Sequence, residues 1–150
     1  MAQEKLQLLI VDDDEGITGS LSILLESEGY QTDVAHTVKE AIEKSCENYY
    51  NLAIIDIKLP DGEGTSLLRA LRETSPNIVK IMLTGYPTLG NSVNSLNDGA
   101  DAYLIKPVDL ETLLETIKRK IEEQKVAEVT TEESIAVFLQ TRTKKLLTEI

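Results

Sequence analysis

The residues most able to do chemistry are carboxylates that directly follow apolar runs. Asp12 and Asp13 follow the run at residues 6–11, and Asp56 follows the run at 52–55. An isolated ionised carboxylate is costly to bury, so we expect these side chains at a rim that water and ligands can reach. Three carboxylates brought together repel one another, which favours a bound cation. Mg²⁺ suits such a group because it is typically held by one or two carboxylates, waters and a phosphate.

Two complementary side chains follow later apolar runs. Thr84 comes after the run at residues 78–83, and Lys106 comes after the run at 101–105. A carboxylate beside Mg²⁺ can attack phosphorus and form an acyl phosphate. A hydroxyl and an ammonium can then hold the phosphoryl oxygens. The five residues together predict phosphoryl transfer onto a carboxylate.

Each of these residues also has a purely structural interpretation. Asp14 is best interpreted as the cap of the helix that follows it. Asp56 could only open the turn before Pro60, Thr84 could be an ordinary strand-end residue, and Lys106 could be a surface lysine. Because four of the five expected strand ends carry complementary chemistry, the pattern favours a functional site.

The elements that must position these residues alternate regularly along the chain. Apolar runs indicate strands at residues 6–12, 52–56, 78–83 and 101–105, and an alternating pattern indicates a strand at 31–35. Helical periodicity indicates helices at residues 15–29, 37–49, 64–76, 88–99 and 109–124. This alternation predicts an α/β fold with a five-stranded parallel sheet, doubly wound, in the flavodoxin-like strand order 2-1-3-4-5. In such a fold the strands' carboxyl ends meet at one edge, where sites form.

The composition is that of a globular protein with an acidic body. The 150 residues are 41% hydrophobic and carry a net charge of −11, all of it within residues 1–124. This charge disfavours direct nucleic-acid binding through phosphate contacts. The sequence shows no membrane-span pattern and no signal-peptide pattern. A single cysteine, Cys46, excludes an internal disulfide, so we expect a cytoplasmic protein with Cys46 in the core.

Several segments resemble the receiver domains of two-component response regulators. The matching segments are LLIVDDDE (8–15), LAIIDIKLPDGEG (52–64), IMLTGYPT (81–88) and GADAYLIKP (99–107). The acidic pair, the phosphoacceptor, the threonine and the Lys-Pro pair occur in the family's order and at family-like spacings. We therefore expect residues 1–124 to form a receiver domain and residues 125–150 to form a C-terminal helical extension.

The resemblance implies a role in phosphoryl transfer for each candidate residue. Asp56 would accept a phosphoryl group from the phosphohistidine of a sensor histidine kinase. Asp13 would bind Mg²⁺ directly and Asp12 through a water, while Asp56 and the Lys58 carbonyl would complete the protein's ligands. The reaction modifies the chain itself and ends in hydrolysis, so we do not expect an enzyme with a separate substrate.

The resemblance also implies how the signal leaves the site. Thr84 and Lys106 would grip the phosphoryl group, and Tyr103 would be the aromatic switch that changes the 84–106 face. The Lys106–Pro107 peptide bond is usually cis in this family. Lys58 and Tyr86 occupy the positions that tune the lifetime of the acyl phosphate. The expected partners are a sensor kinase, an unknown downstream protein and a possible second copy of this chain, with no membrane contact.

Two other functions are compatible with parts of the pattern. A haloacid-dehalogenase-like phosphatase also uses an Asp nucleophile and Mg²⁺, but it needs Thr or Val two residues after its Asp-x-Asp motif. Here Asp12 and Asp14 are followed by Gly16. The second alternative is the receiver fragment of a larger transcription factor. The 26 residues after Gln124 are too few and too neutral for a typical DNA-binding module.

The last segment carries a helix pattern of its own. Thr130 and Glu133 form a capping box, and Ile135, Phe138 and Leu139 share one helical face. We expect an additional C-terminal helix docked on the domain or on another subunit. The alternative is a frayed terminal segment.

Overall fold

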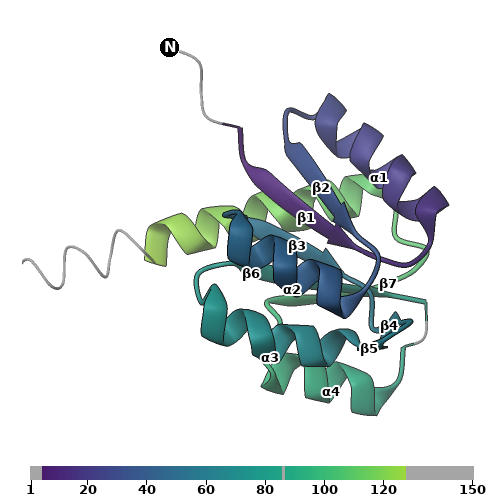
Figure 1. The fold of residues 1–150 in the computed structure, drawn as a ribbon. Coiled ribbons are helices and arrows are strands. Elements are labelled where there is room, and N and C mark those ends of the chain that lie inside the picture. The colour runs from purple at the N-terminus through teal and green to yellow at the C-terminus, as the bar shows by residue number, and fades with distance from the viewer. Residues whose placement is uncertain (1–4, 86, 128–150) are drawn as a thin grey trace, which may run out of the picture.

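A five-stranded parallel sheet covered by helices on both faces forms the centre of the molecule (Figure 1). The computed structural model describes residues 5–85 and 87–127. The strands of this sheet are β1 (Gln7–Val11), β2 (Gln31–Ala35), β3 (Leu52–Ile55), β6 (Val79–Thr84) and β7 (Ala102–Ile105). Their spatial order is β2-β1-β3-β6-β7. The predicted fold class and the 2-1-3-4-5 order are therefore confirmed.

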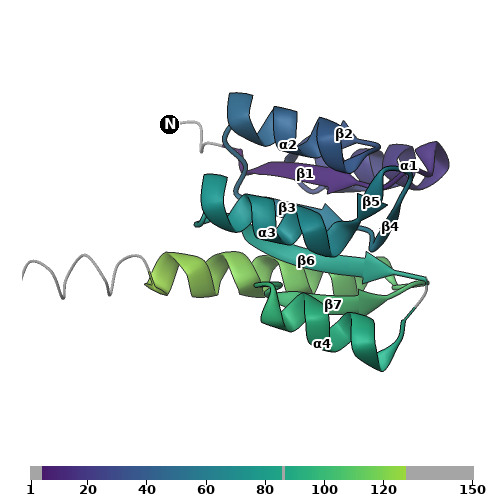
Figure 2. The same cartoon turned by 60° about the horizontal axis from the view of Figure 1, so that its bottom comes forward.

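The sheet divides the interior into two cores, one on each face. Alternate residues of β1 serve different cores, since Leu8 and Ile10 pack on one side and Leu9 and Val11 on the other. The helices are α1 (Glu15–Ser27), α2 (Val38–Glu47), α3 (Gly64–Thr74), α4 (Leu89–Asn97) and an unlabelled helix through residues 110–127. Figures 1 and 2 show α2 and α3 together on one face, with α1 and helix 110–127 on the other.

A small hairpin interrupts this alternation and was not predicted. Its strands, β4 (Lys58–Leu59) and β5 (Gly62–Glu63), are antiparallel and lie between β3 and α3. The turn signal at Pro60 and Asp61 was visible in the sequence, but the flanking strands hold two residues each and leave no alternation to detect. The hairpin places the residues that follow Asp56 in a defined conformation.

The prediction that Cys46 lies in the core is wrong, because its side chain is exposed. The inward positions of α2 are Ala41 and Ser45, which are four residues apart and so share one helix face. The Ser45 hydroxyl is satisfied in this buried position because it donates to the Ile42 carbonyl at 2.8 Å.

Some predictions fall outside the described residues. Beyond Ala127, the helix predicted in residues 125–150 is not among the described residues. Tyr86 is not among them either. Within residues 5–85 and 87–127, no helix is both long enough and apolar enough to span a membrane.

Candidate functional site

The site forms where the central strands end at the same edge of the sheet. Val11 of β1 and Ile55 of β3 are paired in register, so the next residues, Asp12 and Asp56, leave their strands side by side. The Asp56 amide donates to the Val11 carbonyl at 2.9 Å, which extends the ladder to the carboxylate itself. The predicted position of both residues at a strand end is confirmed.

Lys106 reaches the two carboxylates from β7, across β6. Its amide donates to the Thr84 carbonyl at 2.7 Å, which places it directly after the last strand pair. The Lys106 ammonium lies 2.6 Å from Asp12 Oδ2 and 3.4 Å from Asp56 Oδ2. The peptide bond between Lys106 and Pro107 is cis, as the resemblance implied.

Asp13 completes a group of three carboxylates. One oxygen from each of Asp12, Asp13 and Asp56 lies within 4.8 Å of the others, a spacing that a single metal ion could bridge. Asp13 is exposed, whereas Asp12 and Asp56 are only 4% and 9% exposed. A hollow of about 400 Å³ at this point is lined by Asp12, Asp13, Asp14, Ile17, Asp56, Gly85 and Lys106.

Hydrogen bonds with nearby backbone groups hold the acidic segment, residues 12–14, in place. Asp14 caps α1, since its Oδ1 accepts the amide protons of Gly16 and Ile17 at 2.9 and 3.2 Å. The structural interpretation of Asp14 is therefore confirmed. Asp12 Oδ1 accepts a hydrogen bond from the Asp14 amide at 3.0 Å. The Asp12 carbonyl accepts a hydrogen bond from His36 Nδ1 at 3.0 Å.

Burial disfavours the charged form of Asp56. Burial raises the pKa of the Asp56 carboxyl, and the neighbouring Asp12 charge adds to the rise, although Lys106 and a backbone hydrogen bond from Lys58 oppose it. Asp56 Oδ1 is buried and accepts no hydrogen bond from the described residues. Burial also disfavours the Lys106 charge, but the hydrogen bond and charge of Asp12 outweigh it and raise the pKa of Lys106. The lysine is thus fixed as a cation, while Asp56 keeps an unsatisfied oxygen.

Thr84 and Tyr103 lie beside this group rather than in it. Thr84 is fully buried at the end of β6 and is not among the residues that line the hollow. Met82 pairs in register with Tyr103, so Thr84, two residues after Met82, shares a face of the sheet with Tyr103. The Tyr103 hydroxyl is buried, and this burial raises its pKa. The two proposed switch residues are therefore near neighbours.

Gly64 was not among the residues predicted for this site, but the packing requires glycine at this position. A Cβ atom at this position would lie 2.2 Å from the Asp56 carbonyl oxygen and 3.0 Å from Ile55 Cγ2. The Gly64 amide also donates to the Ile57 carbonyl at 2.6 Å. The start of α3 therefore packs directly against the backbone of the candidate phosphoacceptor.

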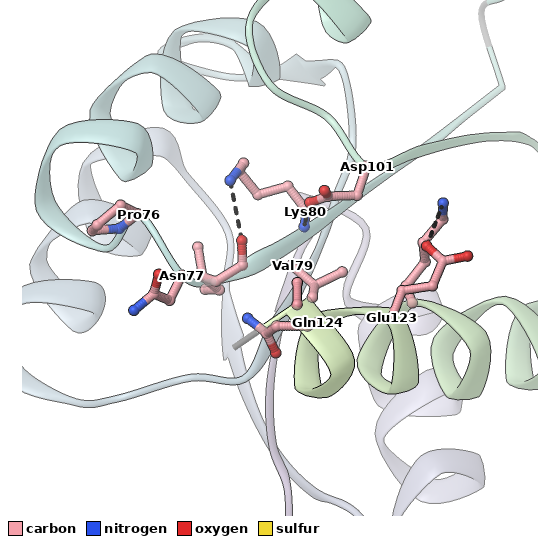
Figure 3. Close-up of a pocket in the computed structure, with 10 residues that line it drawn as sticks. Pro76, Asn77, Val79, Lys80, Asp101, Glu123 and Gln124 are labelled. Carbon is pink, nitrogen blue, oxygen red and sulfur yellow. Dashed lines mark hydrogen bonds and ion pairs between the residues drawn. The ribbon is translucent and has the colours of Figure 1, made fainter. Parts of the chain in front are cut away.

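A larger hollow, of about 620 Å³, lies at the opposite end of β6 (Figure 3). Lys80 on its lining is only 6% exposed, and its ammonium donates to the Ile78 carbonyl at 3.0 Å. The Asp101 carboxylate accepts the Lys80 backbone amide at 2.8 Å through Oδ2, and the ammonium makes no ion pair with it. Burial lowers the pKa of Lys80, although the nearby Asp101 charge opposes this effect. This hollow has no cluster of metal-binding carboxylates among the described residues.

The substitution Lys80→Met is expected to stabilise the protein by about 1 kcal/mol at pH 7, because it keeps the buried alkyl chain and removes a poorly compensated charge. The pKa of Lys80 is lower in the folded protein than its ordinary value of 10.5, so the unfolded chain binds more protons between the two values. Wild-type stability therefore rises with pH in that window. The difference in free energy of unfolding between Lys80→Met and the wild type should therefore be smaller at pH 10 than at pH 7. Denaturant unfolding at pH 7 and pH 10 measures both effects.

Lys120 provides the matched control, because it lines the same hollow but pairs with Glu123 at 3.2 Å on the surface. Lys120→Met is expected to change the free energy of unfolding by less than about 0.5 kcal/mol. A clear loss of stability in Lys80→Met would show that the Lys80 ammonium is well compensated.

The comparison with known proteins agrees with the fold. The response regulator receiver domain model matches residues 8–118. This match covers well over half of the chain, so the chain belongs to the response regulator receiver domain family.

Three relatives illustrate the likeness. A solved CheY-like receiver domain protein from Methanospirillum hungatei JF-1 is 49% identical, with 83% of this chain and 99% of that chain covered and a TM-score of 0.81. A response regulator from Burkholderia pseudomallei, solved with a phosphorylated aspartic acid and a calcium ion, is 31% identical; 83% of this chain and 73% of that chain are covered, with a TM-score of 0.73. The transcriptional regulatory protein YkoG of Bacillus subtilis (strain 168) is 35% identical over 136 residues, which are 91% of this chain and 58% of that protein. The chain thus spans little more than half of that protein's length.

Proposed function

We propose that Asp56 is the phosphoacceptor of this receiver domain and that a sensor histidine kinase is the donor. The observation that carries the proposal is the geometry around Asp56. This carboxylate ends a fully buried strand, keeps one oxygen unpaired, and shares Lys106 with Asp12. A phosphorylated aspartic acid in the Burkholderia pseudomallei relative supports the same chemistry here.

The donor set fits a hard divalent cation such as Mg²⁺. Asp12, Asp13 and Asp56 offer only carboxylate oxygens, and the unpaired Asp56 Oδ1 lacks the partner that a cation would provide. We assign Asp13 and Asp56 as direct ligands, with Asp12 acting through water and the Lys58 carbonyl completing the set. When bound, the cation would neutralise charge on the carboxylates and on the phosphoryl oxygens.

The side chains divide the transfer reaction between them. An Asp56 oxygen attacks phosphorus, the bond between phosphorus and the histidine nitrogen breaks, and the imidazole leaves with the electron pair and takes up a proton. Lys106 is fixed as a cation by Asp12 and can bind a phosphoryl oxygen as negative charge enters the hollow. Thr84 would grip a second phosphoryl oxygen. Later hydrolysis of the acyl phosphate would return Asp56 to its free form.

We also propose that the face formed by residues 84–106 binds the downstream partner. No charged residue occurs from Ile81 to Asn97. Leu89, Val93 and Leu96 expose apolar side chains on α4, at 82%, 46% and 57%. A downstream protein with an apolar surface would find its contact there. We keep residues 1–124 as the proposed receiver unit, although helix 110–127 continues past that boundary.

The direct test is incubation with a small acyl-phosphate donor and MgCl₂, followed by borohydride reduction and mass mapping. We expect the label on Asp56 alone, and no label when EDTA replaces MgCl₂. Labelling of Asp12 would support the phosphatase alternative. Labelling elsewhere, or labelling that does not depend on the cation, would contradict the proposal.

The substitution Thr84→Ala is expected to leave phosphorylation of Asp56 possible but to weaken its effect on Tyr103. Thr84 and Tyr103 share a face of neighbouring strands, so loss of the hydroxyl removes the connection between the phosphoryl group and the ring. Amide NMR shifts of residues 87–106, recorded before and after phosphorylation, measure this coupling. Shifts equal to those of the wild type would show that the signal takes another route.

A further inference from the structure

The hairpin that follows Asp56 is too small to hold its own position. It pairs Lys58 with Glu63 and Leu59 with Gly62, and two such pairs are not stable in water without other contacts. Leu59 packs against the core, but the rest of the hairpin is exposed. Its base is held by the hydrogen bond from the Gly64 amide to the Ile57 carbonyl, so contacts made by its tip are needed to position the rest.

The tip is attached to α2 through the side chain of Asp61. Asp61 Oδ1 accepts the amide proton of Val38 at 2.8 Å, and Oδ2 accepts that of Lys39 at 3.0 Å. These amides open the first turn of α2 and have no partner within the helix. Their hydrogen bonds lower the pKa of Asp61, so the carboxylate stays ionised.

Capping of α2 does not explain this contact, because α2 already has a cap of its own. Thr37 Oγ1 accepts the Glu40 amide at 3.0 Å, which makes Thr37 the N-cap residue. Asp61 belongs to a separate segment that begins at the candidate phosphoacceptor. Its two hydrogen bonds therefore join the hairpin to α2.

The start of α2 also holds the acidic segment on the other side of the site. His36 Nδ1 donates to the Asp12 carbonyl at 3.0 Å, and the His36 amide donates to Glu40 Oε2 at 3.1 Å. One helix end thus contacts the backbone of Asp12 through His36 and the hairpin through Asp61. These contacts fix the two segments relative to each other.

We propose that Asp61 is a positioning residue of the metal site: its contact with the start of α2 holds the hairpin so that the Lys58 carbonyl is in place for the divalent cation. This inference rests on the proposed function, which makes that carbonyl a ligand. Asp61 itself is exposed and is not among the residues that line the hollow of the site. Residues that orient metal ligands typically change affinity by about 10- to 100-fold when they are replaced.

The test compares two substitutions that each remove a hydrogen-bond acceptor from the same helix end. Asp61→Ala removes the contact with the hairpin, and Thr37→Ala removes only the N-cap. Mn²⁺ is the probe, because it takes the same oxygen ligands as Mg²⁺ and its free form is measured by electron paramagnetic resonance. We expect Asp61→Ala to weaken Mn²⁺ binding about tenfold. Thr37→Ala should leave the affinity within about twofold, because its hydrogen bond lies outside the hairpin.

Thermal unfolding separates positioning from stability. Both variants should lower the melting temperature by roughly 3 °C, since each loses hydrogen bonds to the amides of the first turn of α2. Asp61→Asn keeps one acceptor oxygen and should bind Mn²⁺ with an intermediate affinity. Wild-type affinity in Asp61→Ala, or an equal loss in Thr37→Ala, would overturn the inference.

The same titration distinguishes this inference from the function on which it rests. Wild-type protein should bind Mn²⁺, and Asp13→Asn should weaken that binding strongly. If wild-type binding does not depend on Asp13, the proposed metal site fails, and the role of Asp61 fails with it. If that dependence holds but Asp61→Ala binds normally, only the role of Asp61 is wrong.

Discussion

The substitution Asp56→Asn is expected to abolish phosphorylation and, in the absence of divalent cations, to make the protein more stable. The first effect is chemical, because an amide oxygen is a poor nucleophile and a weaker metal ligand than a carboxylate. After incubation with the acyl-phosphate donor and MgCl₂, intact mass spectrometry should show no added phosphoryl group on the variant. The wild type under the same conditions should show one.

The gain in stability follows from the surroundings of Asp56. Its side chain is 11% exposed, Oδ1 is unpaired, and the Asp12 carboxylate shares the same lysine. An amide of the same shape removes a buried charge, while Lys106 keeps its shorter contact with Asp12 at 2.6 Å. We expect the free energy of unfolding in EDTA to rise by about 1 kcal/mol. Urea unfolding monitored by circular dichroism measures it.

Asp13→Asn is the matched control for both effects. It makes the same change of carboxylate to amide in the same group, but Asp13 is exposed and is not the proposed nucleophile. Phosphorylation of this variant should be slowed and should recover as MgCl₂ is raised, and stability in EDTA should change little. Stoichiometric phosphorylation of Asp56→Asn at another residue would contradict the assignment of the phosphoacceptor.

The sheet and the edge that carries the reactive residues were predictable, because buried parallel strands have a distinctive sequence pattern. The runs before Asp12 and Asp56 are apolar without alternation, which is typical of a strand covered on both faces. Once five predicted parallel strands alternate with helices, the carboxyl ends of the strands must meet at one edge of the sheet. The carboxylates and Lys106 could therefore be placed together from the sequence alone.

Features that depend on contacts between distant segments were not predictable in this way. In the sequence, Cys46 falls on the apolar stripe of its helix. In the structure, packing at Ala41 and Ser45 determines which face of α2 is buried, and Cys46 lies outside that face. Lys80 lies inside an apolar run, and its ammonium relies on a carbonyl at Ile78. Asp61 was visible as part of a turn, yet nothing local indicates that it reaches the start of α2.

Gly64→Ala is expected to have the largest effect on stability among the substitutions considered, because the position has no room for a side chain. The added Cβ would lie 2.2 Å from the Asp56 carbonyl oxygen, far inside van der Waals contact. That oxygen belongs to backbone at the end of β3, so it cannot rotate away as a flexible side chain would. Either the start of α3 or the Asp56 peptide must move. We expect a loss of about 3 kcal/mol, near the upper end of the usual cost of overpacking.

Gly62→Ala is the matched control, since the two glycines are two residues apart. A Cβ at Gly62 would have Ser66 Oγ and Val38 Cγ2 as its nearest neighbours, both at an ordinary 3.7 Å. This variant should unfold within about 0.5 kcal/mol of the wild type. The comparison removes the general effect of replacing glycine by alanine in the unfolded chain.

The same displacement should reach the chemistry of the site. Because the clash is with the backbone of the phosphoacceptor, the Asp56 carboxylate of Gly64→Ala should move relative to Asp12 and Lys106, which are held by other strands. At a temperature where the variant is folded, we expect its phosphorylation by the acyl-phosphate donor to be at least about tenfold slower, as misplaced reacting groups lose rate steeply. Gly62→Ala should react at the wild-type rate. Normal stability and a normal rate in Gly64→Ala would mean that α3 can shift away from β3 at little cost, and that its close contact with Asp56 does not position the carboxylate.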